Sequence, residues 1–511
     1  MTKAFLSFLL LSTLFLQTGL AQAGKTSASA ANATAAAPAK AQDADVPFVT
    51  KTLPNGLEVI VLPDAAVPLV TVELAVRNGS FTEPPELNGL SHLYEHMFFK
   101  PNEAALLLQC ESFKSNFVIP QRCGDVNRLK SQIGDVSYIK NIETLGIAYN
   151  GSTREEIVNY YFTTTSPYVA TAMRVINDAV RFPMFDETEF ENEKRVVIGE
   201  LDRNEANPFY YLNRAIMDKL FYKYPTRKNP AGTRETVAAA TTKQMRTIQS
   251  RYYFPNNSAL IVAGNVEPEE IFAMAEKTLG SWKPREVDPF KEFPLVEHPP
   301  LPKSEAVIIE INIGEDDQSS EQNVFIQVGW QGPSIGKDDK ATYAADVFSY
   351  ILQQPDSRFQ RTLVDSGLAS GASINYYTQR NVGPITLFLI TTPEKAKAAL
   401  KAAYAEIAQF GQPGYFTDEE LENSKTILQS SDLFDREKTS EYAHTLGFWW
   451  SSTGVDYFRG YQKNLRSVTR ADISRYVTTY IQDKPHVGIA LLSPAAKSKA
   501  GLNDTDLIGG K

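Results

Sequence analysis

The sequence lacks a surplus of positive charge, and beyond its N-terminal region it lacks any long apolar run. Its formal net charge of −9 argues against a nucleic-acid-binding surface, which is normally basic. Crossing a bilayer as a helix takes about 20 consecutive apolar residues, and no stretch after the N-terminal region has them. We therefore expect no nucleic-acid partner and no membrane span in the mature chain.

The apolar run at the N-terminus has the pattern of an export signal. Lys3 precedes the mostly apolar residues 4–16, and residues 21–23 (AQA) form a small-x-small cleavage site. A membrane anchor is the alternative, but the run is shorter than a bilayer requires. Residues 24–46 hold almost no large apolar side chains, which predicts a flexible tether. We expect an exported protein, located in the periplasm of a Gram-negative bacterium.

Cysteine is scarce, with two residues in the chain, Cys110 and Cys123. In an exported protein two nearby thiols pair more often than they stay free, which predicts a disulfide between them. Two reduced, buried thiols are the alternative. Both cysteines fall within an irregular stretch at about 101–137, which we interpret as a surface insertion.

Histidine is scarce too, and of five histidines only His92 and His96 lie close together, in the arrangement H-x-x-E-H with Glu95. Residues three or four apart share one face of a helix, so both imidazoles can bind one metal ion. Zinc favours nitrogen ligands, and a catalytic site adds a third protein ligand and an open position. A carboxylate beside it can accept a proton from water, which makes Glu95 a candidate base. A buried histidine pair without metal is the alternative.

A second helical pattern, from Glu187 to about Asn207, is rich in acidic residues. Glu193 and Glu200 are about two helical turns apart and therefore lie on one face. Glu200 could complete a zinc site, and Glu193 could orient a histidine or shuttle a proton. Spacing alone leaves a solvated acidic face as the alternative.

The stretches GLSHLYEHMFF and NEKRVVIGEL together resemble the pitrilysin family of zinc peptidases, also called the insulinase family. The family includes insulin-degrading enzyme and the mitochondrial processing peptidases, and H-x-x-E-H is the inverzincin signature. The resemblance implies one Zn²⁺ per chain, held by His92, His96 and Glu200. It also implies that Glu95 and Glu193 are catalytic, as the base and the auxiliary glutamate.

A third stretch, LGIAYNGSTREE, resembles the strand beside the active site of this family. The resemblance implies that Asn150 binds the backbone of the substrate. The alternative is a turn at Asn150-Gly151, a strong turn dipeptide.

The chain repeats itself at roughly half its length. Residues 185–200 (FDETEFENEKRVVIGE) align without gaps to residues 416–431 (FTDEELENSKTILQSS), and the flanking helices and strands correspond as well. This predicts an α+β fold of two homologous domains, each with an antiparallel-rich sheet packed with helices. Ser424 and Ser431 stand opposite Glu193 and Glu200, so only the first copy can bind zinc.

The same patterns predict the domain organisation. His298 falls in a Pro-rich linker, whereas His444 and His486 stand alone and are expected to be structural. The expected segments are a signal peptide (1–23), a tether (24–46), a zinc-binding peptidase domain (47–282, insertion at about 101–137), a linker (283–303), a degenerate homologous domain (304–495) and a C-terminal tail (496–511).

The resemblance also bears on partners. In active relatives the domain that faces the zinc site supplies an arginine–tyrosine pair, and here Val364 and Ser370 stand at those positions. A shifted alignment would recruit Arg361, but no tyrosine follows it at the right distance. The resemblance therefore implies a heterodimer with a paralogous subunit that carries the pair, each chain forming half of a clam-shell chamber.

These inferences predict a zinc-dependent metalloendopeptidase subunit that hydrolyses short or unfolded peptides. One alternative is a non-catalytic scaffold or binding subunit of the same fold. Another is a dedicated protease that processes one peptide precursor.

Overall fold

The computed structural model describes residues 48–104, 142–143, 145–311 and 322–510. The expected signal peptide, the tether, most of the insertion and the Cys110–Cys123 pairing lie outside the described residues. Within the described part, no helix is both long and apolar enough to cross a membrane.

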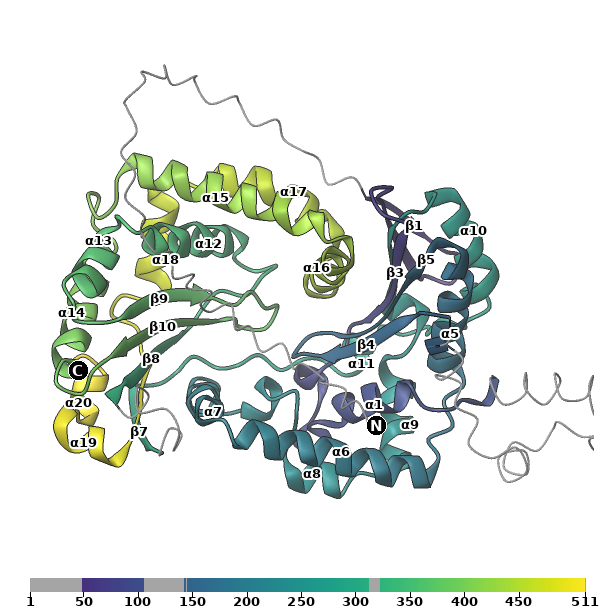
Figure 1. Cartoon of the computed structure of the whole chain (residues 1–511), viewed down its shortest axis with the longest axis horizontal. Helices are drawn as coiled ribbons and strands as arrows, with labels where there is room; N and C mark the ends of the chain where they lie inside the picture. The colour runs from purple at the N-terminus through teal and green to yellow at the C-terminus, as the bar shows by residue number, and fades with distance from the viewer. Residues whose placement is uncertain (1–47, 105–141, 144, 312–321, 511) are drawn as a thin grey trace, which may run out of the picture. The chain divides into compact units, whose positions relative to one another are not determined.

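The first sheet has six strands in the order β1-β2-β6-β3-β5-β4 (Figure 1). All neighbouring strands are antiparallel except β2 and β6, which are parallel. The strands are β1 (Val49–Thr52), β2 (Glu58–Pro63), β3 (Leu69–Val76), β4 (Ala148–Thr153), β5 (Val158–Thr165) and β6 (Ser258–Gly264).

The second sheet has five strands in the order β7-β11-β8-β10-β9, and it repeats the order β2-β6-β3-β5-β4 of the first. Its one parallel pair, β7 with β11, corresponds to the pair of β2 with β6. The strands are β7 (Glu305–Glu310), β8 (Val324–Gln331), β9 (Gly371–Tyr376), β10 (Pro384–Thr391) and β11 (Val487–Leu492). The predicted α+β fold with two homologous halves is confirmed, because the duplication extends to sheet topology.

Helices pack on both sheets. The first half contains α1 (Leu90–Phe98), α5 (Val169–Arg181), α6 (Glu187–Glu205), α7 (Pro208–Leu220), α8 (Arg234–Ala238), α9 (Thr242–Tyr252) and α10 (Pro268–Leu279), and α11 (Pro289–Glu292) follows in the linker. The second half contains α12 (Asp339–Gln353), α13 (Arg358–Gln360), α14 (Ala396–Gln409), α15 (Asp418–Glu437), α16 (Thr439–Ser452), α17 (Val455–Arg466), α18 (Arg470–Tyr480), α19 (Pro494–Ala500) and α20 (Asp504–Leu507).

One helix from each half packs on the sheet of the other half. Helix α16 packs on β3 and β6 of the first sheet, and α7 packs on β7, β8 and β11 of the second (Figure 1). Leu212, Ile216 and Leu220 of α7 form an apolar cluster with strand residues of the second sheet. The two halves are therefore joined by packing as well as by the linker.

Strand β3 shows what this exchange does to the first sheet. Its alternating pattern predicts one buried face, and Val70, Val72 and Leu74 do enter the first core. The opposite face is buried as well, because α16 covers it, and Glu73 there has no exposed surface. A half-buried strand, as the alternation alone would indicate, is therefore not what forms, because both faces of β3 are buried.

The structure decides between a strand and a turn at Asn150, and it differs from expectation at the C-terminus. The stretch around Asn150 is a β4–β5 hairpin, in which Asn150 pairs with Tyr161 and Gly151 with Tyr160. The alternative of an Asn-Gly turn is therefore wrong. At the C-terminus, α19 and α20 fold against the second half, with Leu507 fully buried, so residues 496–510 do not extend as a free tail.

Candidate metal centre

Helix α1 begins at a buried carboxylate. Glu83 accepts hydrogen bonds from the backbone N–H groups of Gly89, at 2.8 Å, and Ser91, at 2.6 Å. These are first-turn groups that have no partner inside the helix. Gly89 has a φ of 86°, and a Cβ there would lie 2.6 Å from the Cα of Gly232. This close approach of two backbones favours glycine and fixes the direction of the helix.

The helix brings the two motif histidines together at Glu200 of α6. Nε2 of His92 and Nε2 of His96 each lie 3.5 Å from Oε2 of Glu200. The two rings are nearly perpendicular, with centroids 4.9 Å apart. One ligand atom from each of the three residues falls within 4.8 Å of the others, and His92 and Glu200 are buried.

These three side chains fit a zinc ion. With Zn–N and Zn–O distances of about 2.0–2.2 Å, a tetrahedral site separates its ligand atoms by about 3.3–3.6 Å. Both nitrogen-to-Glu200 separations fall in that range. The donor set of two imidazoles and one carboxylate is that of a catalytic zinc site with one position left for water.

The charges around the histidines also favour a cation. Burial, followed by the neighbouring His96, lowers the pKa of His92 to about 3, which keeps this side chain in the neutral form that binds a metal. Burial by itself lowers the pKa of His96, but hydrogen bonds with Glu193 and Glu200 outweigh it and raise that pKa to about 10. The surroundings therefore stabilise a positive charge at this point, which a divalent ion would supply in place of the proton.

Glu193 and Glu200 of α6 each direct one oxygen to a histidine and the other to a cation. Oε2 of Glu193 lies 3.1 Å from Nδ1 of His96, and Oε1 forms an ion pair with Lys100. Oε1 of Glu200 lies 3.3 Å from Arg203, which leaves Oε2 for the histidines. Carboxylates in this position fix the tautomer and orientation of ligand histidines. Sequence reasoning missed both cations, although Lys100 directly follows the motif.

Glu95 lies beside this group and outside it. Its Oε2 accepts a hydrogen bond of 2.9 Å from Oγ1 of Thr153 on β4. A Cβ on Gly151 would lie 2.7 Å from its Oε1, so β4 passes directly over the carboxyl group. Burial raises the pKa of Glu95 to about 7, which suits a group that takes and returns a proton near neutrality. Nothing in the sequence pattern pointed to Thr153.

Asn150 is exposed on β4, the last strand of the first sheet. Its Oδ1 accepts a hydrogen bond of 2.9 Å from the N–H of Gly151. Among the described strands β4 pairs with β5 alone, so its outer edge faces away from the sheet next to Glu95.

The other three histidines contact residues outside the metal group. His444 is paired with Glu73, and Nε2 of His486 lies 3.0 Å from the hydroxyl of Tyr404. The ring of His298 packs on Phe221, with centroids 4.6 Å apart. The described residues contain one group of metal-ligand type, and it is the one on α1 and α6.

In the second half, the residues at the positions that correspond to the family's site residues have structural contacts. On α15, Ser424 is fully buried and donates to the carbonyl of Leu421 at 2.7 Å. Val364 packs at the edge of the second core, and the N–H of Ser370 donates to the carbonyl of Ile390.

Two family models match successive parts of the chain. Residues 59–109 and 131–233 match a model described as insulinase (peptidase family M16). Residues 239–428 match a model described as peptidase M16 inactive domain. The first match contains the whole metal group, and the two together cover more than half of the chain.

Individual proteins agree with these matches. The chain is 21% identical over 436 residues to the zinc protease PqqE of Helicobacter pylori, covering 84% of this chain and 90% of that protein. It is 22% identical over 464 residues to the probable mitochondrial-processing peptidase subunit beta of Arabidopsis thaliana, covering 87% of this chain and 78% of that protein.

Solved structures share the fold. A protease from Helicobacter pylori superposes with a TM-score of 0.71 at 20% identity, covering 87% of this chain and 99% of that one. The periplasmic protease PqqL from Escherichia coli superposes with a TM-score of 0.66 at 16% identity, covering 91% of this chain and 49% of that one.

Proposed function

The chain belongs to peptidase family M16, the insulinase family of zinc proteases, and on that premise we propose a metalloendopeptidase subunit that hydrolyses short or unfolded peptides. The observation that carries the proposal is the grouping of His92, His96 and Glu200, with Glu95 beside them and outside the ligand set. A scaffold protein would have no need of a buried carboxyl group held next to three ligand side chains.

The residues have separate tasks in hydrolysis. When bound, zinc supplies Lewis-acid chemistry and lowers the pKa of water toward neutrality. Glu95 accepts a proton from the attacking water as the water oxygen forms a bond to the scissile carbonyl carbon. It then returns that proton to the leaving nitrogen as the C–N bond breaks. Glu193 holds the ring of His96 in place through Nδ1.

The edge of β4 supports a peptide as the substrate. An extended peptide can add to an exposed strand through main-chain hydrogen bonds, which do not depend on the side chains of the peptide. Asn150 and Gly151 lie on this edge next to Glu95. A folded protein has few free strands to offer, so this mode of binding favours short or unfolded chains.

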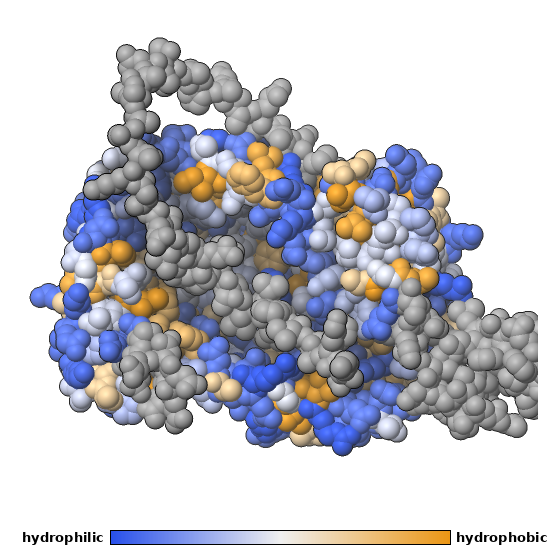
Figure 2. All heavy atoms as spheres, in the orientation of Figure 1, coloured by the Kyte–Doolittle hydropathy of each residue, from blue (hydrophilic) through white to orange (hydrophobic). Residues whose placement is uncertain are grey.

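We further propose that the active enzyme is a heterodimer with a paralogous subunit. The named relative from Arabidopsis is one subunit of a processing peptidase. Val364 and Ser370 occupy the positions of the arginine–tyrosine pair, which the paralogue would supply. Helix α15 also exposes apolar side chains, with Phe434 73% exposed, and Figure 2 shows apolar surface over α15 and α17. Exposed apolar patches of this kind are typical of protein contacts.

The export pattern of residues 1–23 and the periplasmic relative PqqL support a periplasmic location. We also propose the domain organisation that the sequence predicts: a signal peptide, a tether, a zinc-binding domain, a linker, a degenerate second domain and a C-terminal tail.

The test is cleavage of a quenched fluorescent peptide mixture by the zinc-loaded chain, alone and with a paralogous subunit. Glu95→Gln is the matched control, because it keeps the size of the side chain and removes the base. We expect the wild type to turn over peptide when the paralogue is present, and Glu95→Gln to be slower by at least about 100-fold. The zinc content of the variant, measured by elemental analysis, should be unchanged. Equal turnover in both proteins would exclude Glu95 as the base, and a zinc-loaded pair without any turnover would favour a scaffold.

A further inference from the structure

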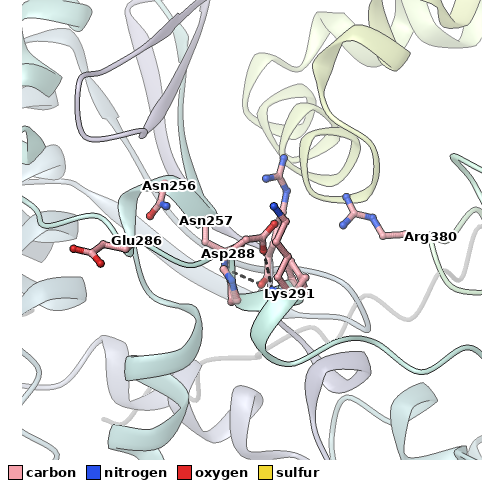
Figure 3. A pocket seen from close by; sticks show the side chains of 9 residues that line it. Asn256, Asn257, Glu286, Asp288, Lys291 and Arg380 are labelled. Carbon is pink, nitrogen blue, oxygen red and sulfur yellow. Dashed lines mark hydrogen bonds between the residues drawn. The ribbon is translucent and has the colours of Figure 1, made fainter.

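A polar pocket lies where the two halves and their linker meet (Figure 3), and no residue of the metal group lines it. Arg77 follows the end of β3, Lys291 lies on α11 of the linker, and Arg380 lies in the loop between β9 and β10. The pocket is lined by Arg77, Asn256, Asn257, Glu286, Asp288, Pro289, Phe290, Lys291 and Arg380.

The two arginines are fixed by the C-terminal end of α16. Nη2 of Arg77 donates to the carbonyl of Trp450 at 3.2 Å, and its guanidinium lies 4.1 Å from the centre of the Trp450 ring. Nε of Arg380 donates to the carbonyl of Ser452 at 2.9 Å, and Nη2 donates to that of Ser451 at 3.1 Å. These contacts fix two positive side chains on the lining of one pocket.

Carboxylates offset these charges only in part. The nearest one to Arg77 is Glu58, at 3.9 Å. Asp288 accepts the backbone N–H of Phe290 at 2.8 Å, and Glu286 points away from Arg380 in Figure 3. Among the described residues neither Lys291 nor Arg380 forms an ion pair, and Nε of Arg77 is buried without a hydrogen-bond partner.

We propose that this pocket binds a small dianionic oxyanion, such as inorganic phosphate or a phosphate monoester. A guanidinium presents N–H groups in a fork that matches two oxygens of one phosphate, and an ammonium adds a point charge. Arg77 contains a buried donor without a partner, which is costly, and a negative charge beside its guanidinium offsets part of that cost. Because its ligands come from both halves and the linker, the bound anion stabilises their arrangement.

The test is titration of the full chain with inorganic phosphate by calorimetry, at constant ionic strength. We expect saturable binding with a Kd of about 1 mM or tighter. Glycerol phosphate in a second titration distinguishes the free ion from a monoester as the preferred source. Binding of either ligand supports the site.

Lys291→Gln is the discriminating variant, because Lys291 is exposed and caps no helix. It should weaken phosphate binding by about tenfold, the effect of one charge-assisted hydrogen bond, with an unchanged thermal midpoint in the absence of phosphate. Lys283→Gln, at another exposed linker lysine, should bind as the wild type does. An absence of saturable binding, or equal affinity in Lys291→Gln and the wild type, would overturn the proposal. Peptide hydrolysis does not enter this test, so its outcome is independent of the proposed function.

Discussion

Glu73, in the middle of β3, is paired with His444 on α16 of the other half of the chain. Its carboxylate has no exposed surface and also accepts a hydrogen bond of 2.8 Å from Nδ2 of Asn159. The ring of Tyr161 lies against His444, with centroids 4.1 Å apart. A buried charge of the first sheet is therefore neutralised by the second half.

This pair predicts a pH-dependent stability. Burial by itself lowers the pKa of His444, but the charge and hydrogen bond of Glu73 outweigh it and raise that pKa above its ordinary value of 6.5. Below pH 6.5 His444 is charged in both the folded and the unfolded chain, so the pair contributes fully. The contribution is lost as the pH rises through the raised pKa of the folded state.

The measurement is urea unfolding of the metal-free wild type and of His444→Gln across this pH range. We expect the variant to be less stable by about 1–3 kcal/mol below pH 6.5, with a difference that shrinks at alkaline pH. In a Glu73→Gln background the same substitution should cost little. A difference that grows with pH would contradict the assignment.

Glu200→Ser places on α6 the residue that stands at the corresponding position of α15, Ser431. It removes the oxygen that both histidines approach at 3.5 Å. We expect zinc affinity to fall by more than about 100-fold, as measured by competition with a chromogenic chelator. Glu191→Ser is the matched control, because Glu191 is exposed on the same helix and pairs with Lys194. Equal zinc affinity in the wild type and Glu200→Ser would exclude Glu200 as a ligand.

Lys100→Met should weaken zinc binding although Lys100 touches no ligand. Without the ammonium, Glu193 loses the partner of its outer oxygen and holds His96 less firmly. We expect a loss of zinc affinity of about tenfold. Lys100→Arg should restore most of it, because the positive charge returns. If Lys100→Met and Lys100→Arg have the same zinc affinity, the positive charge at this position does not contribute to zinc binding.

Gly329 on β8 allows the close approach of α7 to the second sheet. A Cβ there would lie 2.8 Å from Cδ1 of both Ile216 and Leu220. Gly329→Val should therefore lower the free energy of unfolding by about 1–3 kcal/mol in urea denaturation. Gly371→Val is the control, because the nearest atom to a Cβ on β9 lies at 3.6 Å. Equal stability of the two variants would show that α7 can move away without cost.

Local patterns predicted the parts of the site that lie on one helix face. His92 and His96 share a face of α1 because residues four apart always do, and Glu193 and Glu200 share a face of α6 for the same reason. The family resemblance then linked the two helices. Lys100 and Thr153 escaped prediction, because neither lies at a spacing that marks a site. Their roles depend on which carboxyl group the fold places beside them.

The Asn150-Gly151 dipeptide shows the limit of local patterns. It is compatible with a turn and with a strand, and pairing with Tyr161 and Tyr160 on β5 decides for the strand. Likewise the alternation of β3 predicts one buried face, and only α16, from the other end of the chain, buries Glu73 on the second face.

The sequence by itself therefore determined the metal-ligand types, the helix faces that carry them and the duplication of the fold. The helix faces follow from backbone periodicity, which acts over a few residues, and the duplication follows from the similarity of residues 185–200 to residues 416–431. The family resemblance predicted that Glu200 joins both histidines, and the tertiary structure brings them together. That Thr153 binds Glu95, and that α7 and α16 each pack on the sheet of the opposite half, is visible only in the tertiary structure. Such contacts join residues far apart in the chain, and they form because burying the apolar faces of both halves together is favourable.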